Sequence, residues 1–223
     1  MQGCFLQALR RGLFSTLVLL VGGGWVINAD AHPHSWVDYT QRIQFDTEGR
    51  VTALIQQWKL DPIYSTSLFE SLGIRPGRAP TDQQKRTLAK NVAENLQEEN
   101  YLTHLRQGKQ PIAFDKAKEY SADIDDHRLV FTFTLPLAQP LVLNEPLHVQ
   151  VFDDSYFVEF LYDDQVSHAL TLLNAPASCH HDIRHANPTP AQLARASAID
   201  INGKAPDGLG KVFTDTGVVT CRG

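Results

Sequence analysis

The sequence predicts an α+β fold, mainly an antiparallel β-sandwich or meander with one amphipathic helix packed on it and a short C-terminal helix. Three observations favour this class. Short segments of alternating apolar and polar residues follow each other closely, one longer segment has helical periodicity, and an alanine-rich stretch opens the tail.

The first part of the fold is expected to be a β-hairpin formed by residues 36–45 and 51–60. Gly49 lies in the connection and can adopt the positive φ that such a loop often needs. Asp61-Pro62 is expected to end the second strand, because proline cannot donate to a ladder.

A helix is predicted after Thr81, because Gln84 three residues later completes a capping box. Leu88, Val92 and Leu96 fall four residues apart on one face of this helix, and the charged residues on its other face predict a solvated surface.

Apolar alternation returns after residue 100 and predicts strands at residues 101–106, 111–116, 129–135, 147–152, 156–161 and 166–173. We interpret the frequent aromatic residues of these strands as core packing. Thr189-Pro190-Ala191 predicts a short helix with proline at its first position. Residues 218–221 are expected to form a last strand.

The N-terminus has the pattern of a secretion signal. Arg10 and Arg11 precede an apolar stretch at residues 13–27, and Ala29-Asp30-Ala31 provides small residues at the cleavage positions. The stretch is shorter than the roughly 20 residues of a membrane-spanning helix. Residues 1–31 are therefore expected to be removed, which leaves a single periplasmic domain at residues 32–223.

Composition excludes several function classes. Loss of the signal changes the formal net charge from −5 to −6, which disfavours nucleic-acid binding. No second apolar stretch approaches spanning length, so no membrane insertion is expected after cleavage. Nucleophile-elbow, P-loop, dinucleotide and zinc-protease motifs are absent, so no enzymatic activity is predicted. We interpret Asp153-Asp154 and Asp163-Asp164 as turn residues.

Two cysteines, Cys179 and Cys221, remain in the expected mature chain. An even pair in an oxidising compartment favours a disulfide. The alternative is that Cys179 binds a metal beside His180 and His181. His181 and His185 are four residues apart, which on a helix is a common zinc-ligand spacing, but Asn187-Pro188 favours an exposed polar loop instead.

The stronger metal hypothesis concerns His32-Pro33-His34. After cleavage, the α-amine and imidazole of His32 can chelate one ion, and His34 can supply a third nitrogen, which suits copper, nickel or zinc. Pro33 excludes a square-planar site built on deprotonated amides, because it has no amide proton. The alternative is a frayed terminus with two solvated histidines.

Several motifs together resemble the bacterial family known as domain of unknown function 1007. They are His32-Pro33-His34 after a signal, Asp38 on the first strand, Trp58-Lys59-Leu60-Asp61 at the end of the second, Val151-Phe152-Asp153, Tyr156-Phe157-Val158, and the later cysteine. The chain departs from the family pattern at Asp153-Asp154-Ser155, where a proline tends to follow the aspartate.

The resemblance implies a periplasmic component of a transport system associated with an inner-membrane permease of the nickel/cobalt efflux type. It implies candidate metal positions at His32, His34 and Asp38, and less strongly at Asp61, with Asp38 as a ligand or as a partner of a histidine. The expected function is an accessory or binding protein for a divalent transition metal (nickel, cobalt, zinc or copper). The alternative is an envelope interaction module with no ligand of its own.

Overall fold

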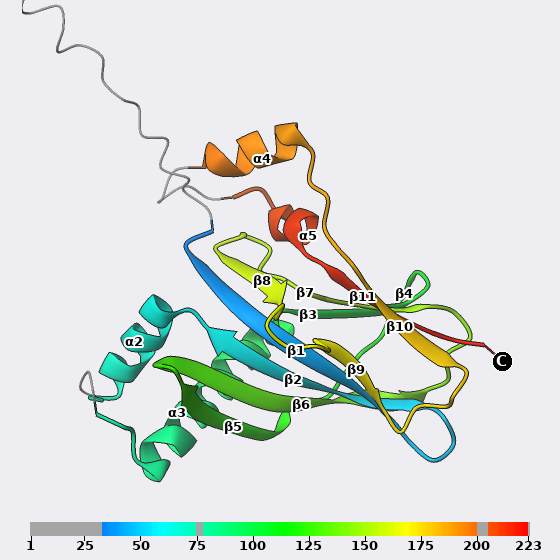
Figure 1. Ribbon diagram of the computed structural model, residues 1–223, viewed down its shortest axis with the longest axis horizontal. Helices are drawn as coiled ribbons and strands as arrows, with labels where there is room; N and C mark the ends of the chain where they lie inside the picture. Colours follow the sequence, from blue (N-terminus) through cyan, green and yellow to red (C-terminus); the bar gives the residue numbers. More distant parts are fainter. Residues whose placement is uncertain (1–32, 75–77, 200–204, 223) are drawn as a thin grey trace, which may run out of the picture. The chain divides into compact units, whose positions relative to one another are not determined.

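The computed structural model describes residues 33–74, 78–199 and 205–222, which form two β-sheets with helices beside them (Figure 1). One sheet contains β1 (Ser35–Phe45), β2 (Val51–Leu60), β5 (Lys118–Asp125), β6 (Arg128–Leu141), β8 (Val158–Tyr162) and β9 (Leu170–Leu173). The other contains β3 (Thr103–Gln107), β4 (Gln110–Pro111), β7 (Leu147–Val151), β10 (Cys179–Arg184) and β11 (Thr216–Cys221). This arrangement confirms the predicted α+β class. The predicted signal and the cleavage site before His32 lie outside the described residues.

Strand order shows how the chain crosses between the sheets. The six-stranded sheet has the order β5-β6-β2-β1-β8, with β9 also paired to β1, and the second sheet has the order β10-β11-β7-β3-β4. The β1–β2 hairpin is confirmed, and Gly49 has a φ of 75°. Most pairs are antiparallel as predicted, but β8 and β9 each run parallel to β1. β8 follows β7 of the second sheet and β9 follows β8, so neither is joined to β1 by a tight hairpin that would make the pair antiparallel.

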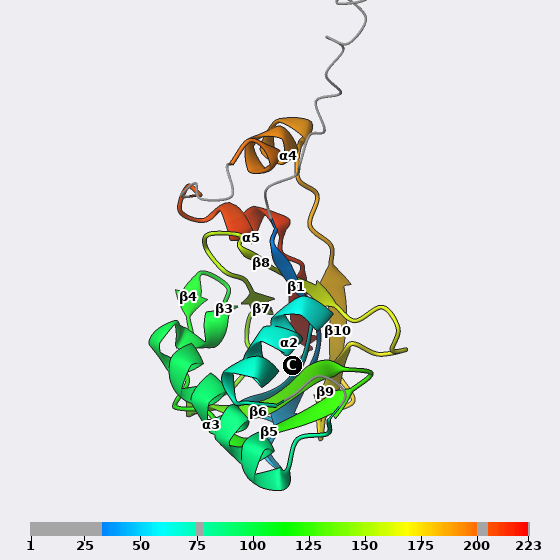
Figure 2. The same ribbon diagram turned by 90° about the vertical axis from the view of Figure 1, so that its left-hand side faces the viewer.

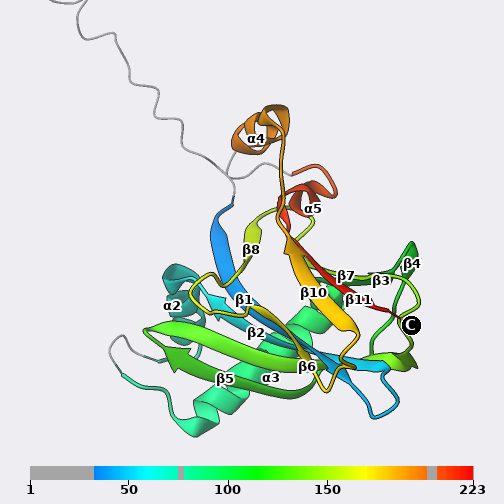
Figure 3. The same ribbon diagram turned by 45° about the vertical axis from the view of Figure 1, so that its right-hand side comes forward.

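Helices cover part of the six-stranded sheet (Figure 3). The capping box of α3 (Asp82–Glu98) is confirmed, and α3 packs on β5 with Leu88, Ala89 and Ala93 buried. The Pro190 prediction is also confirmed, because α4 (Pro190–Ser197) begins there behind a Thr189 cap. The sequence did not predict α2 (Pro62–Ser71), the short 3-10 helix at Asn100–Leu102 or α5 (Leu209–Phe213).

One strand prediction is wrong, and the strand that follows it was not predicted. Residues 111–116 are not a strand, since β4 ends at Pro111 and only an isolated bridge joins Phe114 to Leu137. Residues 118–125 form β5 instead, and Ala122 is its buried side chain. Because the other side chains of this edge strand are mostly exposed, it lacks the apolar alternation that identifies a strand.

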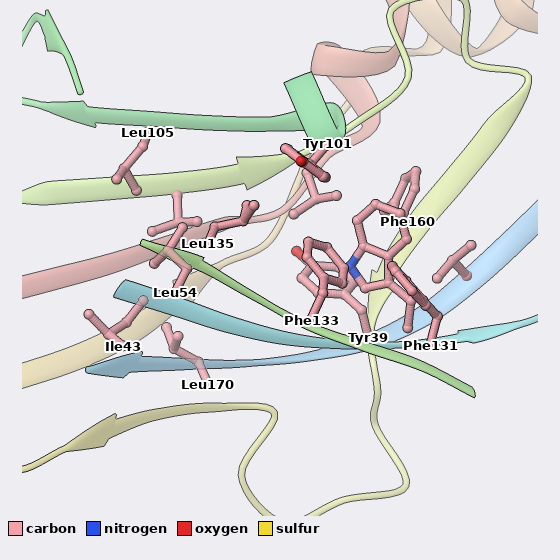
Figure 4. Close-up of a cluster of buried hydrophobic side chains, with 14 of the residues drawn as sticks. Tyr39, Ile43, Leu54, Tyr101, Leu105, Phe131, Phe133, Leu135, Phe160 and Leu170 are labelled. Atoms are coloured by element: carbon pink, nitrogen blue, oxygen red, sulfur yellow. The ribbon is translucent and has the colours of Figure 1, made fainter. Parts of the chain in front are cut away.

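The inward faces of both sheets and of α3 form one hydrophobic core. Figure 4 shows labelled side chains of β1, β2, β6, β8 and β9, among them Tyr39, Leu54 and Phe133, in one cluster with Leu105 of β3. The rings of Trp58 contact Phe133 and Phe160 edge-on, with centroids 5.0 and 4.9 Å apart. Most of the predicted aromatic packing is therefore present.

A chain of polar groups runs through this apolar core. Gln56 is fully buried, and its Oε1 accepts hydrogen bonds from Trp58 Nε1 (3.1 Å) and Gln41 Nε2 (3.3 Å). Its Nε2 donates to Thr103 Oγ1 on the other sheet at 2.9 Å. Tyr162 Oη donates to Gln41 Oε1 at 2.7 Å, and burial raises the pKa of the Tyr162 hydroxyl. The chain thus joins the two sheets by hydrogen bonds between side chains.

A smaller cluster lies at α4 and α5 (Figure 2). In it Tyr156 stacks on Phe213 with ring centroids 4.3 Å apart. The turn before β8 supports it. Asp153 accepts backbone hydrogen bonds from Ser155, Phe157 and Val158. The interpretation of the Asp153-Asp154 pair as turn chemistry is thus confirmed for Asp153.

Candidate functional site

The start of β1 is the described part of the predicted N-terminal metal site. His34 immediately precedes β1, and its backbone N–H donates to the carbonyl oxygen of Phe157 at 2.9 Å. Its imidazole lies against the Phe157 ring, with centroids 4.7 Å apart. His32, the proposed chelating residue, lies outside the described residues. The segment that enters β1 is therefore fixed at His34 to the start of β8.

Asp38 lies further along β1 on its outward side and forms an ion pair with Arg128, with 2.6 Å between Oδ2 and Nη2. Arg128 also donates to the backbone carbonyls of Leu60 and Lys59. Four residues of extended chain span about 13 Å, so Asp38 and His34 are not brought together to bind one ion. This geometry gives Asp38 a structural partner at the start of β6, which is not a histidine.

Asp61 is also tied to the fold. It is 2% exposed and caps α2, because its Oδ1 accepts from the backbone N–H groups of Ile63 (2.8 Å) and Tyr64 (3.0 Å). Its Oδ2 accepts from the Ser35 hydroxyl. A carboxylate that binds these donors stabilises the first turn of the helix and joins it to β1. The arrangement explains Asp61 without a metal.

His180 and His181 lie on β10, whereas His185 follows the last residue of this strand, so the helix interpretation is wrong and the loop interpretation applies to His185 alone. Successive side chains of a strand point to opposite faces, so His180 and His181 diverge. His181 and His185 are about 13 Å apart along extended chain, whereas a helix would place them on adjacent turns. His185 Nδ1 instead lies 2.9 Å from Asp215 Oδ2. The structure therefore does not bring the three histidines together.

Cys179 and Cys221 form the predicted disulfide. They are opposite each other in the β10–β11 register, at the ends of both strands. Cys179 is therefore not a metal ligand. Across residues 33–74, 78–199 and 205–222, no group of three histidine, cysteine, aspartate or glutamate side chains is placed to hold a metal ion.

An exposed apolar stripe was missed by the sequence interpretation, which assigned aromatic residues to the core. Trp36 is 41% exposed and Phe157 is 46% exposed. In the parallel β1–β8 register Trp36 is opposite Glu159, so Phe157 and Leu161 are its diagonal neighbours on the outward side. We call Trp36, Phe157 and Leu161 the outer apolar stripe. The alternation of β1 carried this signal, because Trp36 has opposite parity to the core residues Val37 and Tyr39.

These features define a disulfide-linked two-sheet domain with a histidine at the entrance to its first strand. Within the described segments, no helix is long and apolar enough to cross a membrane.

The chain belongs to the family described as protein of unknown function DUF1007, whose profile matches residues 17–221. It is also 32% identical over 82 residues to the uncharacterized 15.5 kDa protein in the trpE 3′ region of Spirochaeta aurantia. That alignment covers 37% of this chain and 59% of the relative's length.

Proposed function

We propose that the protein is a periplasmic accessory or binding protein of a divalent transition-metal transport system, and that it presents the metal through His32 and His34. The single observation that carries this proposal is the ordered position of His34, held by its backbone to Phe157, directly after the His32-Pro33 dipeptide. A ligand held at the entrance to a strand gives the terminal chelate a fixed third nitrogen. The proposed ligand set leaves out Asp38 and Asp61, because both have structural partners.

The chemistry of the proposed site follows from its donors. A terminal amine and imidazoles are nitrogen ligands, which suit nickel, copper, zinc and cobalt. The amine has an ordinary pKa of about 7.7–8.0 and the imidazole about 6.5, and both must lose a proton to bind. Affinity is therefore expected to rise between about pH 5 and pH 8. The metal would pass to or from an inner-membrane permease.

Calorimetric titration with nickel, copper and zinc tests the proposal. The protein that begins at His32, with its N-terminus verified by intact mass, is compared with one that carries an additional alanine before His32. The extra residue converts the amine to an amide and should weaken binding sharply. His34→Ala should weaken it less, because the two-nitrogen chelate of His32 survives.

His181→Ala and His185→Ala are the matched controls, because both remove an exposed imidazole far from β1 in the sequence. Both should leave affinity within about twofold of the unmodified protein. Equal affinity with and without the added alanine would contradict the chelate.

A second candidate function is an interaction module of an envelope complex, which the outer apolar stripe favours. Contiguous exposed apolar side chains are typical of protein–protein contact sites. Trp36→Ser with Leu161→Ser should then abolish co-purification with the cognate permease. Tyr120→Ser, which replaces another exposed aromatic residue on β5, is the control.

A further inference from the structure

The outward face of the five-stranded sheet differs in character from the rest of the described surface. Leu105, Val149 and Val219 point into the core, so the residues between them point outward. These outward residues are rich in cationic and imidazole side chains. We call the following set the basic face: His104 and Arg106 on β3, His148 on β7 and Arg184 on β10, with Lys211 of α5 beside them.

Register places these side chains across four adjacent strands. Arg106 pairs with His148, His148 with Val218, and Val218 with Asp182, two residues before Arg184. Neighbouring strands are about 4.8 Å apart, so Arg106 and Arg184 flank a strip about 14 Å wide. Val218 forms the floor of the strip and is only 4% exposed although it points outward. The strip therefore has a covered apolar centre between two guanidinium groups.

The arginines of this face are available for an external anion. Arg128 and Arg50 each form an ion pair elsewhere in the fold, but Arg106 and Arg184 form none with a described carboxylate. Arg106 donates to the carbonyl of Gly108, and Arg184 makes no side-chain hydrogen bond within the described chain. Asp182 is the acidic side chain of the strip itself, and Asp154 approaches His104 at its edge.

The titration of His148 is consistent with a positive potential here. Burial, followed by the charges of Arg106 and Arg184, lowers the pKa of His148. The same charges repel a metal cation, so the imidazoles of this face are poor candidates for the metal site. They attract carboxylates, which arginine binds through two parallel hydrogen bonds.

We propose that the basic face docks an acidic, extended segment of a partner protein. Alternate residues of an extended segment lie about 7 Å apart on one side, so two or three carboxylates match a strip of this width. The described large apolar side chains that are exposed all lie elsewhere, which disfavours a membrane surface as the occupant. The proposal does not depend on the metal site, because the two share no residue.

Fluorescence anisotropy with a labelled octaglutamate peptide tests this inference on the full protein at about 50 mM salt, where exposed charges are weakly screened. Arg106→Gln with Arg184→Gln should weaken binding at least about tenfold. Arg86→Gln with Arg195→Gln removes the same charge from α3 and α4 and should change affinity less than about twofold.

Arg184→Gln alone keeps the test valid if the double variant folds poorly, because Arg184 makes no side-chain hydrogen bond within the described residues. It should still weaken binding by at least about threefold. Absence of salt-sensitive binding, or an equal loss in the control variant, would overturn the proposal. Vesicles with 30% phosphatidylglycerol in phosphatidylcholine provide the last comparison. Arginine-dependent binding to these vesicles, without binding to the peptide, would assign the face to a lipid and overturn the acidic-segment proposal.

Discussion

The buried hydrogen bonds of Gln56 should determine how strongly the two sheets hold together. Gln56→Leu keeps the volume close to that of glutamine but removes every side-chain bond that Gln56 makes to Gln41, Trp58 and Thr103. The indole N–H of Trp58 and the amide of Gln41 then lose an acceptor inside the core. Each buried donor without a partner costs about 1–3 kcal/mol, so the free energy of unfolding should fall by about 2–6 kcal/mol.

Urea unfolding followed by tryptophan fluorescence measures this loss, and thermal unfolding provides a second readout. For a domain of this size, a loss of 3 kcal/mol lowers the melting temperature by about 6–12 °C. Gln57→Leu is the matched control on the adjacent, outward side of β2, and should stay within about 0.5 kcal/mol. A Gln56→Leu protein within about 1 kcal/mol of the unmodified protein would refute the argument that this network stabilises the sandwich.

Three further predictions concern the disulfide, the α2 cap and the basic face. Cys179→Ala with Cys221→Ala should lower the free energy of unfolding by up to about 4 kcal/mol, which is the loop-entropy value for a separation of 42 residues. An unchanged urea midpoint would exclude a stabilising role for the disulfide. Asp61→Ala should lower the free energy of unfolding by about 1–2 kcal/mol through the lost cap, and Asp61→Asn should lower it less. Calorimetry should show unchanged metal affinity in both variants. Weaker metal binding by a stable Asp61→Asn protein would restore Asp61 as a ligand. Because the pKa of His148 is lowered in the folded protein, its contribution to stability is complete above the unfolded pKa of about 6.5 and is lost as the pH falls below that value. His148→Gln should therefore make the free energy of unfolding, measured by urea titration, depend less on pH below about 6.5. The exposed control His168→Gln should not have this effect.

The sequence predicted elements whose signals are local. The β1–β2 hairpin depends on Gly49, the capping box of α3 lies within four consecutive residues, and Pro190 marks the start of α4, so each could be recognised without knowledge of the fold. The α2 helix had an equally local signal, an aspartate N-cap followed by proline at the first position. It was missed because the segment buries only Ser65 completely and lacks a clear apolar stripe.

Edge strands were missed for a different physical reason. β5 and β10 are held by backbone hydrogen bonds to one neighbour, and most of their side chains face solvent. Neither strand therefore shows the apolar alternation on which a sequence prediction depends. The pairing of Asp38 with Arg128 was also invisible, because the two residues are 90 positions apart in the sequence and meet only in the folded sheet.

The histidine pattern after Cys179 shows how strongly a site hypothesis depends on secondary structure. A spacing of four residues places two side chains about 6 Å apart on a helix but about 13 Å apart on a strand. Pairing with β11 selects the strand, and the same register brings Asp215 to His185. The imidazoles of His181 and His185 are consequently separated from each other, and that of His148 is flanked by arginines. The proposed metal site depends on the terminal nitrogen of His32, so one added residue before His32 is the decisive perturbation.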